Sequence, residues 1–197
     1  MGKIFCVMGK SSSGKDTIYK ELKEIYKEFL PITMYTTRPI RNGETEGIEY
    51  HFVSKEKFEK MYSDNKVIEY RTYDTVHGPW TYFTADDGQI NLKEENYLVI
   101  GTLKSYQSIR EYFGEDKVTG IYIEIDDGVR LSRALKREMK EENPKYEEMC
   151  RRFLADQEDF SEENLKACSI EKRFVNNDLK ECIEEIKSFI DEQIILL

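Results

Sequence analysis

The sequence lacks long hydrophobic segments and an excess of basic residues, and both absences narrow its function. No apolar run approaches the roughly 18 residues that a membrane-spanning helix needs, so we expect no membrane partner. The 39 acidic side chains outnumber the 30 basic ones, which gives a formal net charge of −9. Nucleic-acid-binding proteins normally carry a basic face, so we expect no nucleic-acid partner. A local basic site for a small phosphorylated molecule remains possible.

Histidine and cysteine are also scarce. The two histidines, His51 and His77, come without a Ser or Cys elbow motif, so no catalytic triad is indicated. The four cysteines are widely spaced and form no C-x-x-C pair, which excludes a zinc site or a disulfide framework of the usual spacing. Because the N-terminal residues also lack a signal-peptide core, we expect reduced thiols and a cytoplasmic location.

Apolar segments of strand length alternate with longer helical patterns. The expected strands are residues 4–8, 97–100 and 120–125, with a fourth within 170–175, and the expected helices include 17–29 and the tail from Leu179. Such alternation predicts an α/β protein whose parallel sheet has helices on both faces.

Two stretches interrupt this alternation. Residues 32–83 contain short alternating strands around one short helix at 55–62, which predicts a small inserted sheet. In one of these strands Val67, Glu69, Arg71 and Tyr73 share a face. Residues 130–160 are helical and rich in charge, and Pro144 divides them, which is typical of a solvated helical hairpin or a mobile cover.

A glycine-containing loop links the first strand to the first helix. Its sequence, Gly9-Lys10-Ser11-Ser12-Ser13-Gly14-Lys15-Asp16-Thr17, fits the phosphate-binding pattern G-x-x-x-x-G-K in the required strand–loop–helix context. The glycines let backbone N–H groups surround a phosphate, and the helix N-terminus adds its positive dipole end. Lys15 can reach the β- and γ-phosphates. Asp16 follows it where a Ser or Thr is usual, so Mg²⁺ would be held through waters, by Thr17 or with help from Asp16.

A second group of polar residues follows the expected strand at 32–37. Arg38 and Arg41 stand three apart, and Glu44 and Tyr50 come soon after them. Two neighbouring arginines can clamp a phosphate, although alone they would more simply be exposed loop residues.

Taken together, these motifs resemble the guanylate kinase family. The matching residues, in order from residue 4 to about 190, are the P-loop, Thr36-Thr37-Arg38, Arg41, Gly43-Glu44, Gly47, Tyr50, Phe52, Ile68-Glu69, Gly78 and Val175-Asn176-Asn177-Asp178-Leu179. The resemblance implies a P-loop NTPase three-layer fold with a parallel core sheet, an inserted small mixed-sheet acceptor domain and a helical lid. The core would comprise residues 1–32, 84–129 and 157–197, the acceptor domain 33–83 and the lid 130–156.

The resemblance also implies a reaction in which ATP and Mg²⁺ phosphorylate a nucleoside monophosphate, GMP or dGMP, to its diphosphate. It implies small-molecule nucleotides as partners, a role in purine nucleotide metabolism and a monomer or homodimer. The implied catalytic residues are Lys15, Arg38, Arg137 and Arg152. The implied ATP site comprises Gly9, Ser11, Ser12, Ser13, Gly14, Lys15, Asp16, Thr17, Arg133 and Asn176. The implied acceptor site comprises Arg38, Arg41, Tyr50, Glu69, His77 and Thr102, with Glu69 reading the guanine.

The sequence departs from the family pattern around the acceptor base. Met34 replaces a serine, His77-Gly78 replaces Tyr-Gly, and Ile100-Gly101-Thr102 replaces D-x-D. Two alternatives therefore stay open: a related phosphotransferase with another nucleotide acceptor, and a catalytically silent binding module. Trp80 is either an edge aromatic of the small sheet or a stacking surface for a base.

Overall fold

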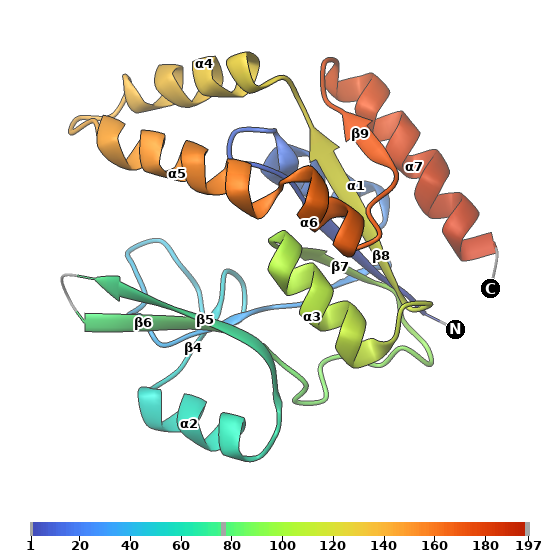
Figure 1. Ribbon diagram of the computed structural model, residues 1–197. Helices are drawn as coiled ribbons and strands as arrows, with labels where there is room; N and C mark the ends of the chain where they lie inside the picture. The colour runs from blue at the N-terminus through green and yellow to red at the C-terminus, as the bar shows by residue number, and fades with distance from the viewer. Residues whose placement is uncertain (1, 76–77, 196–197) are drawn as a thin grey trace.

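The computed structural model describes residues 2–75 and 78–195 and contains two sheets (Figure 1). The larger sheet is parallel throughout, with the strand order β2-β7-β1-β8-β9. Its strands are β1 (Ile4–Met8), β2 (Leu30–Pro31), β7 (Tyr97–Ile100), β8 (Val118–Glu124) and β9 (Arg173–Val175). Strand β1 lies in the middle, so the loop that follows it opens at the centre of the sheet's carboxyl edge.

Helices cover both faces of this sheet, as the alternating pattern predicts. Helices α1 (Lys15–Ile25) and α7 (Leu179–Ile195) lie on one face, where Phe5 and Val7 share a core cluster with Ile18 and Ile186. Helices α3 (Leu103–Phe113) and α6 (Glu162–Ala167) lie on the other face, where they pack with Ile4, Cys6 and Met8 of β1. All five side chains of β1 are fully buried. The molecule is therefore a three-layer α/β structure, as expected.

The smaller sheet is mixed and has its own core. It has the strand order β4-β3-β6-β5, in which β3–β4 is parallel and the other pairs are antiparallel. Its strands are β3 (Tyr35–Thr36), β4 (His51–Phe52), β5 (Val67–Thr75) and β6 (Gly78–Ala85). Helix α2 (Lys55–Ser63) packs Met61 and Phe58 against Tyr35 and Phe83. This is the inserted sheet that the pattern of residues 32–83 predicts.

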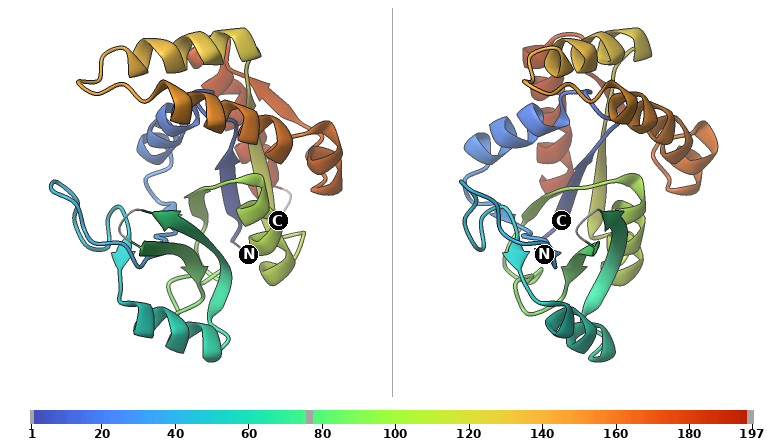
Figure 2. Two further views of the ribbon diagram at one scale, coloured as in Figure 1. Left: turned by 60° about the vertical axis from the view of Figure 1, so that its left-hand side comes forward. Right: turned by 90° about the vertical axis from the view of Figure 1, so that its left-hand side faces the viewer.

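Helices α4 (Asp127–Glu138) and α5 (Tyr146–Asp159) form the expected charged hairpin, with Pro144 in the connection between them. Figures 1 and 2 show this hairpin at one end of the molecule and the small sheet with α2 at the other. The carboxyl edge of the parallel sheet lies between them.

Some element boundaries differ from those predicted. Helix α1 begins at Lys15 and ends at Ile25, because Tyr26 has a non-helical backbone (φ −101°, ψ 68°) that turns the chain toward β2. Strand β2 and helix α6, with two and six residues, are too short to produce a detectable periodicity and were not expected. No helix among the described residues is long and apolar enough to cross a membrane.

Helix α1 offers a matched test of this packing. Leu22 is fully buried, whereas Ile25 on the same helix is 40% exposed. Leu22→Ala should lower the free energy of unfolding by about 2–5 kcal/mol because it leaves a cavity. Ile25→Ala should cost about 1 kcal/mol or less. Urea unfolding followed by circular dichroism measures both, and equal losses would contradict the assigned faces.

Candidate functional site

The P-loop, residues 9–17, follows β1 and is shaped by two close approaches. A Cβ at Gly9 would lie 2.6 Å from the carbonyl oxygen of Ile123, and one at Gly14 would lie 2.3 Å from Asn176 Nδ2. Gly14 also has a φ of +94°, in the left-handed region that favours glycine. Both glycines are therefore required by the local packing as well as by the motif.

Asn176, which follows β9, fixes the backbone of this loop by hydrogen bonding. Its side-chain Nδ2 donates to the carbonyl oxygen of Ser13 at 2.8 Å, and its backbone N–H donates to the Glu124 carbonyl oxygen at 2.8 Å. The residue is 3% exposed. The sequence placed Asn176 at the ATP site, and the structure puts it against the loop backbone.

The open side of the P-loop faces a pocket of about 570 Å³ that contains several cationic and hydroxyl side chains. The pocket is lined by Ser12, Gly14, Asp16, Thr17, Arg133, Arg137, Asn176, Asn177, Asp178 and Leu179. Lys15 begins α1, and its Nζ lies 3.7 Å from the exposed carboxylate of Asp16. The buried hydroxyls of Ser12 and Ser13 have no hydrogen-bond partner among the described residues. Two arginines line this pocket and the N-terminus of α1 opens onto it, an arrangement that suits an anion.

A narrower pocket of about 110 Å³ separates the P-loop from helices α4 and α5. Arg137 and Arg152 line it from the two helices, opposite Ser11 and Ser12. Arg151 instead makes two 2.7 Å hydrogen bonds to Glu148 on its own helix. Of the two neighbouring arginines of α5, Arg152 is thus the one beside the P-loop.

A network of charged residues around the buried Arg130 fixes the α4–α5 hairpin to the P-loop, and most of its contacts could not be predicted from the sequence. Asp156 accepts a 2.8 Å hydrogen bond from the Ser11 backbone N–H and lies 3.2 Å from Arg130 Nη1. Arg130 is 1% exposed, pairs with Asp127 at 2.6 Å and lies over the ring of Phe153. Asp156 is 145 residues from Ser11, so no local pattern could reveal this contact.

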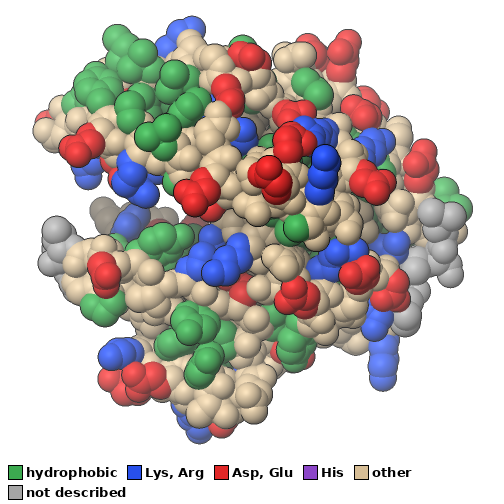
Figure 3. Space-filling view, in the orientation of Figure 1, with side chains coloured by type: hydrophobic (Ala, Val, Ile, Leu, Met, Phe, Trp, Pro, Cys, Tyr) green, Lys and Arg blue, Asp and Glu red, His purple; other side chains and the backbone are tan. Residues whose placement is uncertain are grey.

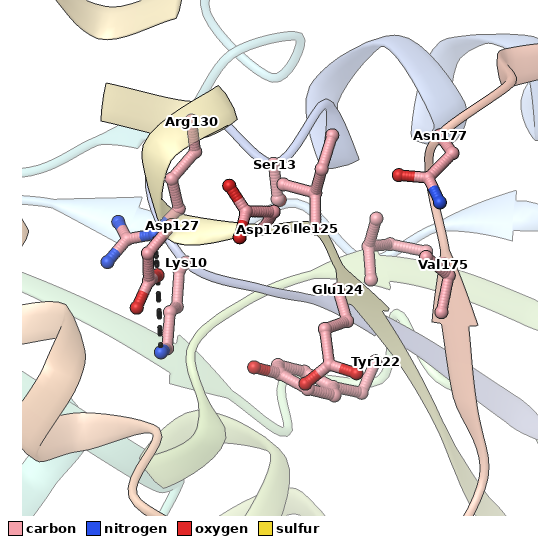
Figure 4. A pocket seen from close by; sticks show the side chains of 11 residues that line it. Lys10, Ser13, Tyr122, Glu124, Ile125, Asp126, Asp127, Arg130, Val175 and Asn177 are labelled. Atoms are coloured by element: carbon pink, nitrogen blue, oxygen red, sulfur yellow. Dashed lines mark hydrogen bonds and ion pairs between the residues drawn. The ribbon is translucent and has the colours of Figure 1, made fainter. Parts of the chain in front are cut away.

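Figure 4 shows the pocket on the far side of this network. Lys10 and Asp127, joined there by a dashed line, lie 3.7 Å apart, and Arg130 enters from the first turns of α4. The pocket has a volume of about 400 Å³ and contains both acidic and basic side chains. Lys10 therefore pairs with the carboxylate at the start of α4, whereas Lys15 has no carboxylate partner other than Asp16 among the described residues.

On the small sheet, Arg38 is held in one orientation. Its guanidinium forms a two-point contact with Glu44, with N–O distances of 2.7 and 2.5 Å, and it is 4% exposed. The rings of Tyr50 and Phe52 lie 5.1 and 5.2 Å from its central carbon. Burial raises the pKa of the Tyr50 phenol, so that it stays a hydrogen-bond donor. Arg41 is exposed, and only its backbone N–H contacts Glu44.

Beside Tyr50 lies an aromatic pocket of about 360 Å³. It is lined by Met34, Tyr50, Arg71, Tyr73, Thr75, Trp80 and Tyr82. Figure 3 shows the molecule hollowed between the α4–α5 end and the end that carries β5 and β6, with Lys and Arg side chains at the rim. Trp80 lines the pocket, which fits both of its predicted roles.

Arg71 connects Glu69 of β5 to the start of α3, where Thr102 lies, because it is 3.8 Å from Glu69 and donates to Ser105. Glu69 is 8% exposed and accepts a 3.0 Å hydrogen bond from Thr84 Oγ1. Burial, with the nearby Glu69 charge, raises the pKa of the Cys6 thiol to about 12. Thr102 caps the N-terminus of α3 through Ser105 N–H at 3.3 Å. The predicted site residue His77 lies outside the described residues.

The residues present suit a Mg²⁺ ion carried on nucleotide phosphates. Mg²⁺ prefers oxygen ligands and usually keeps several waters in sites that bind substrate phosphates. Asp16 and Thr17 are exposed on the first turn of α1 and line the pocket beside the P-loop. No group of three His, Cys, Asp or Glu side chains within residues 2–75 and 78–195 could form a protein cage for a metal.

Comparison with known proteins gives a consistent result. The family model described as guanylate kinase matches residues 1–193. The guanylate kinase of Syntrophotalea carbinolica is 28% identical over 206 residues, covering 96% of this chain and 85% of that protein. The guanylate kinase of Helicobacter hepaticus is 33% identical over 115 residues, 58% of this chain and 56% of that protein. This chain thus aligns with little more than half the length of the second relative.

A solved structure supports the fold. The crystal structure of guanylate kinase from Anaplasma phagocytophilum superposes with a TM-score of 0.63, covering 98% of this chain and 86% of that chain. The two sequences are 19% identical, so this similarity shows the fold alone.

The Arg38–Glu44 contact predicts a pH dependence of stability. The Arg38 hydrogen bonds lower the pKa of Glu44 to about 2, below the roughly 4.3 of an unfolded chain. The stabilisation is therefore complete above the unfolded value and is lost as the pH falls toward 2. Glu44→Gln should flatten the decline in unfolding free energy between about pH 4.5 and 2, measured by urea titrations at each pH.

The control for this experiment is Glu59→Gln, an exposed carboxylate of α2 whose ion pair is to Lys55 at 3.7 Å. It should keep the slope of the parent protein. Identical slopes for the parent and Glu44→Gln would contradict the proposed coupling.

Proposed function

This chain belongs to the guanylate kinase family, and we propose that it transfers the γ-phosphoryl group of ATP to GMP or dGMP with the residues described above. One observation carries the residue assignment. The P-loop with Lys15, the arginines of α4 and α5 and the carboxylate of Glu69 all gather around the carboxyl edge of one parallel sheet. Phosphoryl transfer needs such a place, where two anionic substrates are held in line among cations.

The donor side is the P-loop. Its backbone N–H groups and Lys15 would hold the ATP phosphates. Arg133 and Arg137 would contact the donor from α4, since both line the pocket at Gly14. Arg152 would approach the transferred group from α5, since it lines the narrow pocket opposite Ser12. Asp16 and Thr17 would hold Mg²⁺, directly or through waters, and the ion would supply positive charge that offsets the charge of the nucleotide phosphates.

The acceptor side is the small sheet. Arg38, Arg41 and Tyr50 would bind the acceptor phosphate, with Glu44 fixing the orientation of Arg38. Glu69 would accept hydrogen bonds from the guanine, because guanine presents two neighbouring donors on one edge.

The reaction then needs no covalent intermediate. An oxygen of the acceptor phosphate attacks the γ-phosphorus, the bond from that phosphorus to the bridging oxygen breaks, and ADP leaves. Lys15, Arg137 and Arg152 stabilise the charge on the transferred group. Closure of α4 and α5 would exclude water, which would otherwise accept the phosphoryl group.

Three parts would carry out these steps. The core (1–32, 84–129 and 157–197) would hold ATP, residues 33–83 the acceptor, and residues 130–156 would form the lid. The four cysteines are free thiols, which suits a reducing compartment, and we place the protein in the cytoplasm on that ground.

Closure gives one prediction. Because three separate segments contribute arginines to one reaction, the parts should approach each other when both substrates bind. Small-angle scattering should show a smaller radius of gyration with a non-hydrolysable ATP analogue and GMP together than with either alone. An unchanged radius would argue against a closing lid.

The role of Lys15 gives a second prediction. Lys15→Met should lower kcat by about 100-fold or more, because it removes a cation at the transferred charge, while circular dichroism stays unchanged. Lys20→Met, an exposed lysine on the same helix, is the control and should keep parent activity. ADP formation from ATP and Mg²⁺ with GMP, dGMP, AMP, CMP, UMP and dTMP measures both. Parent-level turnover by Lys15→Met would refute the catalytic role of Lys15. Selective turnover of another nucleotide by the parent protein would show that GMP is not the preferred acceptor.

A further inference from the structure

Arg71 lies in the acceptor region but has no role in the mechanism derived above. It projects from β5 opposite Tyr82 of β6 and two residues after Glu69, on the same face of the strand. It lines the aromatic pocket beside Met34 and Trp80. It also lines a second pocket of about 360 Å³, formed with Thr102, Lys104 and Gln107 of the α3 region. The guanidinium therefore stands at the boundary between the small sheet and the core.

The hydrogen bonds of Arg71 are incomplete. Its Nη2 donates to Ser105 Oγ on α3 at 2.7 Å. Its Nε is buried and has no hydrogen-bond partner among the described residues. The nearest carboxylate oxygen, Glu69 Oε2, is 3.8 Å away, which is an ion-pair distance but too long for a hydrogen bond. A buried charged donor without an acceptor is unfavourable, so this group is suited to an acceptor supplied by a ligand.

Glu69 complements Arg71. One of its oxygens accepts from Thr84 Oγ1 at 3.0 Å, and the other faces the Arg71 guanidinium. The two side chains thus place acceptors and donors next to each other, with aromatic rings of Tyr73, Trp80 and Tyr82 around the adjoining pocket. A planar ligand with hydrogen-bond donors beside hydrogen-bond acceptors matches this arrangement.

We propose that Arg71 is a specificity-determining residue that donates hydrogen bonds to the O6 and N7 acceptors of a guanine while Glu69 accepts from its N1–H and N2 amino group. Arginine pairs with O6 and N7 of guanine through two parallel hydrogen bonds. Adenine carries an amino donor at the position of O6, so the guanidinium would face another donor. This inference rests on the proposed function and adds Arg71 to the residues that would read the acceptor base.

The first test compares Arg71→Met with the parent on GMP and AMP. Loss of the guanidinium should lower kcat/KM for GMP by roughly 10- to 100-fold, mainly through KM. The KM for ATP and the turnover of AMP should change little, so that the preference for GMP falls by the same factor. Arg71→Lys keeps the charge without the planar fork and should lie between the two. Arg110→Met, an arginine of α3 that contacts Glu115 at 2.8 Å, is the control.

The second test uses altered bases in calorimetric binding experiments. 7-Deaza-GMP lacks the N7 acceptor and 6-thio-GMP has a weaker acceptor at position 6, while both keep N1–H and the N2 amino group. The parent protein should bind both analogues more weakly than GMP, and Arg71→Met should bind all three alike. A purely structural role for Arg71 would not remove this discrimination.

Several outcomes would overturn the inference. These are equal losses for GMP and AMP in Arg71→Met, undiminished discrimination among the three guanine nucleotides in that variant, and failure of the parent protein to bind GMP. The proposed function is tested separately, by ADP formation in the parent protein. GMP binding that depends on Arg71 without ADP formation would uphold the base assignment and refute the kinase activity.

Discussion

The complete burial of β1 is the constraint on which the rest of the structure depends. Its five side chains alternate between two core clusters, and none of them is exposed to solvent. A one-residue shift of a strand buried on both faces would exchange its side chains between the two clusters, and each cluster is packed around particular side chains. The chain that leaves its carboxyl end is therefore fixed in position, and Gly9 and Gly14 let it turn within contact of Ile123 and Asn176. The anion-binding pocket follows from this fixed starting point.

The arginines of the site fall into two groups, buried ones that pair with carboxylates and exposed ones that do not. Arg38 and Arg130 are buried and paired with carboxylates, Glu44 for the first and Asp127 and Asp156 for the second. Such pairs orient charges at a cost in desolvation. Arg133, Arg137 and Arg152 are exposed and make no ion pair with the described residues, yet they line the pockets beside the P-loop. A molecule with a net charge of −9 thus has three unpaired arginines beside the P-loop, where phosphates would bind.

The sequence reveals what depends on local spacing and misses what depends on contacts between distant segments. The P-loop sequence, the parallel sheet, the inserted sheet and the charged α4–α5 hairpin each have a local pattern, and the structure contains all four. The Asp156 contact with Ser11 has none, because 145 residues separate the partners. Arg71 lies between these cases. Strand alternation places it beside Glu69, but its contact with Ser105 depends on how α3 packs against β5. Side-chain periodicity is a local property of the chain, whereas a tertiary contact depends on how distant segments pack.

The way in which the α4–α5 hairpin contacts the P-loop limits how the hairpin can move. The base of the α4–α5 hairpin is joined to the P-loop by a network in which Asp156 contacts both Ser11 N–H and the buried Arg130. Breaking one partner from such a network leaves an uncompensated buried charge, which is strongly unfavourable. The exposed arginines lie nearer than this anchor to the turn that joins α4 and α5. Substrate-driven motion of the lid should therefore be a bending of its outer turns about a fixed base, which would bring Arg137 and Arg152 toward phosphates while the P-loop keeps its shape.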